Sequence, residues 1–277
     1  YNFLIFNKIT IPDITVNANA STEGSSSDNI IDAWIYIDGS LIGTYELPAK
    51  IPIIAEGNFT LQVYGGIKNS GFTTQRKIYP FYNPYETSLT YEANKIDTIY
   101  PVVTYKSNAN IWIEDFEDPG IKLNSPTYSD TTIEITANAA DVFEGSKSGY
   151  VIFDTDDNFF ECSTNEPDFN GFPKFGSPVY VELNYKTNNV FTTGLYHGDN
   201  TLVSLVKSEY LNLVSTNNEW KKIYIDFTDM VSTRTSSTKH QIYFEIRRQT
   251  GVTTPLVFID NVKIYIKFKP DAKEQAT

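Results

Sequence analysis

Cysteine is nearly missing from this sequence, because Cys162 is the only one among 277 residues. A single thiol excludes a disulfide bond within the chain and a zinc site built from several thiolates. Domains of ordinary size fold without such cross-links, so their absence does not identify a cellular compartment. Cys162 lies between Glu161 and Ser163, and no basic neighbour in the sequence lowers its pKa. We therefore interpret Cys162 as a small buried residue and not as a nucleophile.

Long apolar runs and an excess of basic residues are missing too. No run of ~18 or more apolar residues is present, so the sequence predicts no membrane-spanning helix. Lys and Arg number 22 against 34 Asp and Glu, which gives a formal net charge of -12. This charge repels phosphate backbones and excludes nucleic acid as an expected partner. The sequence starts at Tyr1 without a leader, and we expect an export signal or a lipid anchor upstream of it.

The sequence motifs of common enzymes are also absent. The chain has no Gly-x-Ser-x-Gly nucleophile elbow, no His-Glu-x-x-His zinc helix and no glycine-rich phosphate loop. Nothing in the sequence joins His197 or His240 to a nucleophile and a carboxylate, and we interpret both as surface residues. The sequence therefore predicts a non-catalytic protein. A glycoside hydrolase that uses two carboxylates is the alternative, because such a pair need not be close in the sequence.

Aromatic residues are abundant, with 19 Tyr and 18 Phe against one Met. Aromatic and β-branched residues favour strands over helices. Short alternating segments separated by turn residues recur along the chain, whereas helical periodicity is nearly absent. Because ~100–150 residues form a typical domain, the sequence predicts an all-β protein of two domains. We place the first domain at residues 1–108, the second at residues 109–269 and a disordered tail at 270–277.

The clearest local prediction in the first domain is a tight hairpin. Asp38 and Gly39 separate two alternating runs at 33–37 and 41–45, and this pair favours the positive φ angles of a two-residue turn. With the prolines and glycines that follow, the hairpin resembles the small Ig-like and PEGA-like modules of bacterial surface proteins over residues 30–82. The resemblance implies an N-terminal Ig-like β-sandwich.

An aromatic and proline-rich segment, residues 79–85, lies near the end of this region. Its rings either form a rigid surface for a partner protein or glycan, or they close the core or fill the interface between the two domains, and the sequence leaves these alternatives open. The first alternative would make the protein a structural or adhesive surface component that docks another protein.

Three segments of the second domain carry a resemblance to known domains. The domain opens on the acidic aromatic run 112–118, continues with the strand-forming run 220–227 and closes with the strand 257–264. This order resembles the jelly-roll β-sandwiches of carbohydrate-binding modules and galactose-binding-like domains. The resemblance implies a C-terminal jelly roll that binds a glycan on one sheet face and does not catalyse. With the first domain, it implies an extracytoplasmic protein of a bacterial cell envelope, secreted or lipid-anchored, whose partner is a glycan or a surface protein.

Alternation along the strands predicts where a glycan would bind. In the segments 179–186 and 241–247, every second residue is apolar and is expected in the core. The core candidates are Val179, Val181, Leu183, Tyr185, Ile223, Ile225, Phe227, Ile242, Phe244 and Ile246. A single outward face is expected to carry the binding residues Tyr180, Glu182, Asn184, Tyr196, Tyr243, Glu245 and Arg247. Such rings stack on pyranoses while the polar groups bond sugar hydroxyls, although an ordinary solvated face has the same pattern.

The same resemblance implies a structural calcium ion between the first and last strands of the second domain. Glu117, Asp118 and Asp260 lie at the matching ends, and carboxylates are suitable ligands for calcium. The acidic segment 154–158 lacks the glycine and the terminal glutamate of an EF-hand loop, so we interpret it as a turn. Calcium is therefore the one cofactor that the sequence predicts.

Overall fold

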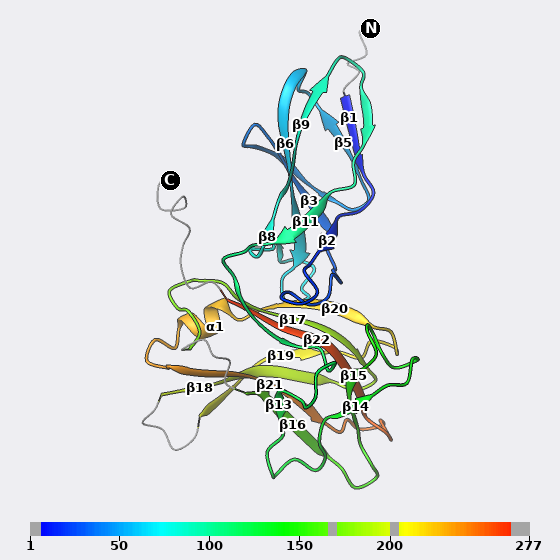
Figure 1. The fold of residues 1–277 in the computed structure, drawn as a ribbon. Coiled ribbons are helices and arrows are strands. Elements are labelled where there is room, and N and C mark those ends of the chain that lie inside the picture. The colour runs from blue at the N-terminus through cyan, green and yellow to red at the C-terminus, as the bar shows by residue number, and fades with distance from the viewer. Residues whose placement is uncertain (1–6, 166–170, 200–204, 267–277) are drawn as a thin grey trace. The chain divides into compact units, whose positions relative to one another are not determined.

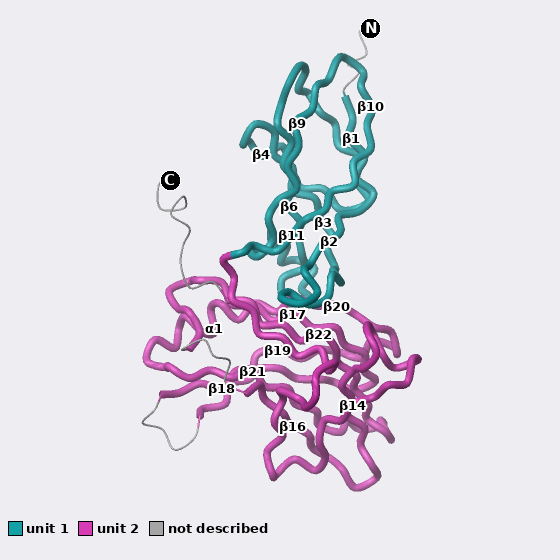
Figure 2. Tube along the Cα trace, in the orientation of Figure 1, with its two compact units in different colours: residues 1–107 teal, residues 108–277 magenta. Residues whose placement is uncertain are grey.

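The computed structural model describes residues 7–165, 171–199 and 205–266, and the chain divides into two compact units, residues 1–107 and 108–277 (Figure 2). Strands follow one another along both units (Figure 1), and the described residues contain one short helix, α1 (Thr228–Ser232). The prediction of an all-β protein is confirmed. No helix in this part of the chain is long and apolar enough to cross a membrane. The tail predicted at 270–277 lies outside the described residues.

The first unit contains three small sheets. The largest, which we call the β6 sheet, has the order β4 (Ser40–Glu46), β3 (Asp32–Ile37), β6 (Gly57–Lys68) and β7 (Arg76–Ile78), and β9 (Tyr85–Tyr91) also pairs with β6. The second sheet joins β10 (Ile96–Thr98), β1 (Asn7–Ile11) and β5 (Ala49–Ile53). The third joins β2 (Thr15–Asn17), β11 (Val102–Tyr105) and β8 (Tyr82–Asn83). The Ig-like character of this unit stays a prediction.

The hairpin predicted at Asp38 and Gly39 is confirmed. These two residues join the antiparallel strands β3 and β4, and their φ angles are 49° and 77°. Positive φ at both central residues is what a two-residue turn of the primed type requires. The Asp38 carboxylate also accepts a hydrogen bond from the backbone N–H of Thr60 at 2.8 Å, which ties the turn to β6.

The aromatic segment 79–85 places its rings in the interior. Tyr79, Phe81 and Tyr82 are all buried. The Tyr79 ring contacts the Phe81 ring at 5.7 Å and the Tyr82 ring at 4.6 Å, measured between centroids. Tyr82 in turn contacts Tyr105 at 4.9 Å. Tyr79, Phe81 and Tyr82 are therefore packing residues, as the second alternative predicts, whereas Tyr85 is half-buried.

The second unit is a sandwich of two antiparallel sheets. The first, the β17 sheet, has the order β14 (Glu134–Thr136), β15 (Ser148–Ile152), β22 (Leu256–Ile266), β17 (Val179–Thr187) and β20 (Lys221–Asp226), and β12 (Asn110–Glu114) also pairs with β22. The second, the β21 sheet, has the order β13 (Leu123–Asn124), β16 (Phe159–Thr164), β21 (Lys239–Arg247), β18 (Phe191–Gly198) and β19 (Val206–Leu213). The chain crosses between the sheets after β12, β13, β15, β16, β17, β19, β20 and β21. This crossing is the predicted jelly roll.

The core of the second unit lies between these two sheets. All ten core candidates named from the sequence are buried in it, so that prediction is confirmed. Cys162 lies in the same core and is fully buried. Burial raises the pKa of the Cys162 thiol, because an apolar environment disfavours the thiolate. The interpretation of Cys162 as a small buried residue is also confirmed.

The prediction that His240 lies on the surface is wrong. His240 is 3% exposed, and its ring stacks on the Phe172 ring at 5.3 Å with an interplanar angle of 6°. Its Nδ1 accepts a hydrogen bond from the backbone N–H of Phe172 at 3.3 Å. Burial lowers the pKa of His240 to about 4, and the positive charges of Lys174 and Arg234 lower it further. His197 is half-buried, and its two ring nitrogens contact the hydroxyls of Ser237 and Ser208.

We predict that the contribution of His240 to stability falls as the pH drops from about 6.5 to about 4. Asp260, whose pKa burial raises to about 7, acts in the opposite direction over this range, so the comparison with a His240 variant isolates the histidine. In this range the native state keeps His240 neutral, whereas in the unfolded chain the imidazole regains its ordinary pKa of 6.5 and binds a proton. His240→Gln should reduce the slope of unfolding free energy against pH in this window. Urea unfolding at several pH values measures that slope. Equal slopes for His240→Gln and wild type would contradict the neutral buried histidine.

Candidate functional site

The outer face of the β21 sheet, which points away from the core, gathers charged and aromatic side chains from four strands. On β16 and β21, the core residues Phe160, Cys162 and Phe244 alternate with these outward residues. In register, Glu161 lies opposite Glu245. The outward residues are Phe159, Glu161 and Ser163 on β16, Gln241, Tyr243, Glu245 and Arg247 on β21, Thr192 and Tyr196 on β18, and Lys207 and Glu209 on β19.

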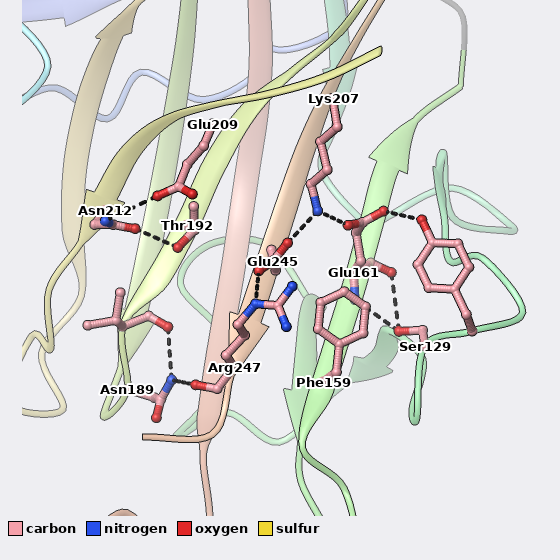
Figure 3. Close-up of polar contacts among 12 residues, drawn as sticks. Ser129, Phe159, Glu161, Asn189, Thr192, Lys207, Glu209, Asn212, Glu245 and Arg247 are labelled. Atoms are coloured by element: carbon pink, nitrogen blue, oxygen red, sulfur yellow. Dashed lines mark hydrogen bonds and ion pairs between the residues drawn. The ribbon is translucent and has the colours of Figure 1, made fainter. Parts of the chain in front are cut away.

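A network of charges crosses this face (Figure 3). The ammonium of Lys207 forms ion pairs with the carboxylates of both Glu161 and Glu245. Arg247 Nε donates a hydrogen bond to the other oxygen of Glu245 at 2.5 Å. The side chain of Glu161 is 2% exposed and that of Glu245 is 10% exposed. Two nearly buried carboxylates therefore share one cation, which connects β16, β21 and β19.

Two tyrosine hydroxyls complete the environment of Glu161. Tyr196 donates a hydrogen bond to Glu161 at 2.5 Å, and Tyr128 donates one to the same oxygen at 2.8 Å. Tyr128 lies in the loop before β14 and is 61% exposed. These bonds fix the Tyr196 side chain and anchor the exposed Tyr128 ring beside the charged network.

The cations of the network lie over aromatic rings. Lys207 Nζ is 4.4 Å from the ring centroid of Tyr243, and Arg247 Cζ is 4.5 Å from that of Phe159. Each such contact contributes about 0.5–2 kcal/mol. Tyr243 is 1% exposed, and its ring extends over Gly194, where a Cβ atom would lie 2.6 Å from the ring. The rings of Tyr243 and Phe159 therefore support the cations and do not form an open stacking surface.

The pKa values in the network show that its charges persist at neutral pH. Burial alone would raise the pKa of Glu161, but hydrogen bonds from Lys207, Tyr196 and Tyr128 outweigh burial and lower it. Burial alone would lower the pKa of Lys207, but Glu161 and Glu245 outweigh burial and raise it. Glu161 is thus an ionised hydrogen-bond acceptor, and Lys207 is a permanent donor.

A pocket of about 390 Å³ opens beside the network. Its lining includes Tyr128 and Ser125 from the loop, Glu161 and Ser163 from β16, Tyr196 from β18 and Gln241 from β21. A carboxylate, an amide and several hydroxyls therefore converge on one concave space next to an exposed ring. Concave sites with a few convergent polar groups are where proteins hold small polar ligands.

The single binding face predicted from the sequence is wrong, because its residues divide between the two sheets. Tyr196, Tyr243, Glu245 and Arg247 do lie together on the outer face of the β21 sheet. The other three, Tyr180, Glu182 and Asn184, lie on β17 in the opposite sheet of the sandwich.

On the β17 sheet, the three separated residues have contacts of their own. Tyr180 donates a hydrogen bond to Asp226 at 2.8 Å, and Glu182 forms an ion pair with Lys222 at 2.6 Å. All three are buried in the structure. Alternation within a strand separates its two faces, but it does not say which sheet the strand joins. These residues therefore leave the candidate site.

The residues on which the site depends most were not predicted from the sequence. Glu161 stands out there only as a neighbour of Cys162, and Lys207, Tyr128 and Gln241 belong to no recognisable binding motif. The one usable signal was the alternation of Phe159, Glu161 and Ser163 with buried residues on a predicted strand. Lys207 reaches Glu161 from 46 residues away, and no local pattern indicates such a contact.

Two of the three predicted calcium ligands hold the same segment, residues 144–148. Glu117 accepts hydrogen bonds from the backbone N–H groups of Ser146 at 2.7 Å and Lys147 at 2.9 Å. Asp260 accepts one from the hydroxyl of Ser148 at 2.6 Å. A cation at either carboxylate would have to share it with these donors.

The third predicted ligand, Asp118, is separate. Its side chain is 74% exposed and lies 3.8 Å from the ammonium of Lys122. Over the described ranges, no group of three His, Cys, Asp or Glu side chains is placed to hold a metal ion. The structure does not bring the predicted three-carboxylate set together, and calcium at Glu117 and Asp260 stays a prediction.

Comparisons with known proteins return similar folds only. No protein-family model and no curated protein matches the sequence. Among solved structures, the family 22 xylan-binding module of Paenibacillus barcinonensis Xyn10C is 17% identical with a TM-score of 0.41, over 56% of this chain and 99% of that one. The family 11 carbohydrate-binding module of the Clostridium thermocellum cellulase Lic26A-Cel5E is 12% identical with a TM-score of 0.37, over 58% and 98%.

A further match extends over more of the chain. It is a carbohydrate-binding module of the β-sandwich superfamily described for promiscuous specificity, 9% identical with a TM-score of 0.35, over 86% of this chain and 87% of that one. At these identities and TM-scores, the comparisons assign neither a family nor a ligand to this chain.

Calcium binding by Glu117 and Asp260 predicts a higher melting temperature in calcium chloride than in EDTA, because a bound ion stabilises the folded state. Asp260→Asn should abolish the difference. Asp118→Asn, which changes an exposed carboxylate outside the pair, should keep it. Equal melting temperatures of the wild type in calcium and in EDTA would contradict the calcium prediction.

We predict strong energetic coupling between Glu161 and Lys207. Lys207→Met leaves two nearly buried carboxylates side by side without a cation, which should cost about 1–3 kcal/mol of unfolding free energy. The double variant with Glu161→Gln should lose less than the sum of the single losses, by about 1 kcal/mol or more. Urea unfolding of the four proteins measures this coupling.

The exposed pair Asp118 and Lys122 is the matched control for this cycle, and its coupling should stay below about 0.5 kcal/mol. A Glu161–Lys207 coupling no larger than that of the control would show that the network does not exist in solution.

Proposed function

We propose that the protein binds a glycan, without catalysis, on the outer face of the β21 sheet. The observation that carries this proposal is the ionised carboxylate of Glu161, nearly buried and paired with Lys207, at the wall of the 390 Å³ pocket. Sugar hydroxyls both donate and accept hydrogen bonds, so a site for them needs fixed groups of both kinds. The exposed ring of Tyr128 adds an apolar face at the edge of the pocket.

The donors and acceptors of the site are held in place before any ligand arrives. Lys207 has three N–H donors, of which Glu161 and Glu245 take two. The guanidinium of Arg247 is 69% exposed and bonds Glu245 through Nε, which leaves its outer nitrogens facing solvent. Because these side chains are already ordered, ligand binding does not reduce their conformational entropy further, and the binding free energy is more favourable.

Stacking in this site depends on Tyr128 and not on Tyr243. Tyr243 was the ring expected from the sequence to contact a sugar, but Lys207 covers it. Tyr243→Ala would therefore disturb the support of Lys207 and would not report a direct contact. Tyr128 stands at the pocket with 61% of its surface exposed, and its hydroxyl is anchored by Glu161.

The electrostatics of the site favour binding over hydrolysis. A glycosidase with two carboxylates needs one of them as a general acid, with a raised pKa. The pKa of Glu161 is lowered, and its neighbour Glu245 shares the same ammonium of Lys207. Neither is arranged as a proton donor. Our proposal includes an extracytoplasmic location, secreted or lipid-anchored on a bacterial envelope, because glycan surfaces lie outside the cytoplasm.

Binding to neutral polysaccharides tests this proposal. Affinity electrophoresis with xylan, β-1,4-galactan and mixed-linkage β-glucan should retard the full chain in at least one gel, and calorimetry should give the affinity. Tyr128→Ala should weaken binding about 10-fold or more, because a stacking contact of about 1.4 kcal/mol or more is lost.

Phe175→Ala is the matched control, since Phe175 is 89% exposed on the same unit but does not line the pocket. Loss of binding in this control equal to the loss in Tyr128→Ala would contradict the proposed site. Release of reducing sugars from a bound polysaccharide would contradict the non-catalytic part.

A further inference from the structure

The outer face of the β6 sheet, in the first unit, carries three large aromatic side chains. On β3 and β6, the residues Ala33, Ile35, Ile37, Leu61 and Val63 are buried in the core. Because strand residues alternate between the two faces, their neighbours lie on the opposite face. Those neighbours are Trp34 and Tyr36 on β3 and Gln62 and Tyr64 on β6. An outer sheet face that faces water ordinarily carries polar residues, so three rings at these positions need an explanation.

The three aromatic residues occupy neighbouring positions on the two paired strands. Trp34 pairs directly with Tyr64, and Tyr36 lies two residues further along β3. The rings of Tyr36 and Tyr64 meet at 5.1 Å between centroids with an interplanar angle of 62°. All three side chains are half-buried, so each ring still presents part of its surface. We call these three residues the aromatic strip.

Gly66 lets the indole of Trp34 lie close against the sheet. A Cβ atom at residue 66 would approach Trp34 Nε1 to 2.8 Å, which is closer than real contacts of this kind. Any side chain there would push the indole away from the strand. The glycine therefore lets the indole lie against the sheet, beside the tilted rings of Tyr36 and Tyr64.

Polar groups border the strip on both sides. Gln62 Nε2 donates a hydrogen bond to Glu86 on β9 at 2.7 Å. On the other side, Thr44 of β4 lies opposite Trp34. Burial raises the pKa of Tyr64, and the nearby Tyr36 and Glu86 raise it further. Ring faces and hydrogen-bonding groups thus alternate over a short distance.

The one arginine at the border forms ion pairs with two neighbouring carboxylates. Arg76 on β7 forms ion pairs with Asp32 at 2.5 Å and with Glu46 at 3.5 Å. Glu86, which lies opposite Gln62 in register, adds a carboxylate to the border. Such a surface, on a chain of net charge -12, does not attract an acidic ligand. An uncharged ligand with apolar C–H faces and many hydroxyls fits this combination of rings, amide and carboxylate.

We propose that the aromatic strip of Trp34, Tyr64 and Tyr36 is a second carbohydrate-binding surface, which stacks on a neutral polysaccharide chain. This inference goes beyond the proposed function, which concerns only the β21 sheet, and it rests on that proposal for the class of ligand. The two surfaces differ in kind, because the strip offers ring faces and the β21 sheet offers fixed charges.

Four forms of the full chain separate the two surfaces. They are the wild type, a site variant with Tyr128→Ala and Arg247→Ala, a strip variant with Tyr36→Ser and Tyr64→Ser, and the combination of all four substitutions. The probes are xylan, β-1,4-galactan and mixed-linkage β-glucan in affinity electrophoresis. The site variant should keep weak binding to a polysaccharide that the wild type binds, and the combined variant should lose it.

The control is Tyr100→Ala, which removes a ring that is 69% exposed elsewhere on the first unit. Loss of all binding in the site variant would overturn the strip while leaving the proposed function intact. If the combined variant keeps the residual binding of the site variant, the strip is overturned too. If the strip variant loses binding and the site variant keeps it in full, the result supports the strip and refutes the β21 site. No binding by the wild type would refute both.

Tryptophan fluorescence provides a readout that does not depend on removing a ring. In a chain with Trp112→Phe and Trp220→Phe, Trp34 is the only tryptophan left. Saturating polysaccharide should shift its emission and protect it from acrylamide quenching by about 2-fold or more. Unchanged emission and quenching of Trp34, with the polysaccharide bound, would overturn the proposal.

Discussion

The ammonium of Lys207, held between Glu161 and Glu245, is the interaction on which the candidate site depends. A carboxylate that is removed from water needs a paired cation and further hydrogen bonds, or its burial becomes costly. Glu161 has both, from Lys207 and two tyrosine hydroxyls. The same contact fixes β19, at one edge of the sheet, to β16 and β21 in its middle. The arrangement of the outer face therefore follows from one buried negative charge and the residues that compensate it.

In our two proposals, the two surfaces hold the same kind of ligand in different ways. On the β21 sheet, cations cover the rings of Tyr243 and Phe159, so the site offers fixed hydrogen-bonding groups beside one exposed ring. On the β6 sheet, the rings of Tyr36 and Tyr64 contact each other and are not covered by a cation in the contacts of the described residues. A ligand that combines hydroxyls with apolar faces can use both. The proposals give each unit a role in glycan binding, whereas the sequence suggested glycan binding only for the second.

Local patterns in the sequence predicted the parts of the fold that depend on neighbouring residues. The alternation in β17 and β21 identified the core, because side chains of a strand alternate between faces whatever sheet it joins. The turn at Asp38 and Gly39 was equally local. The division of the predicted face between two sheets does not follow from local patterns. It arises because the chain crosses the sandwich after β17 and returns to the β17 sheet with β20 before β21. The sequence also failed to predict the burial of His240, because Phe172, which covers it, is 68 residues away in the sequence.

Backbone amide shifts during titration with a short xylan or galactan oligosaccharide test the central claim most directly. Binding on the outer face of the β21 sheet should give large shifts at Glu161, Tyr196 and Gln241, and these three shifts should saturate together. The amides of Tyr180 and Glu182, on the opposite sheet, should stay unchanged. Shifts confined to the β17 sheet, or none on β16, β18 and β21 at a saturating concentration, would contradict the account.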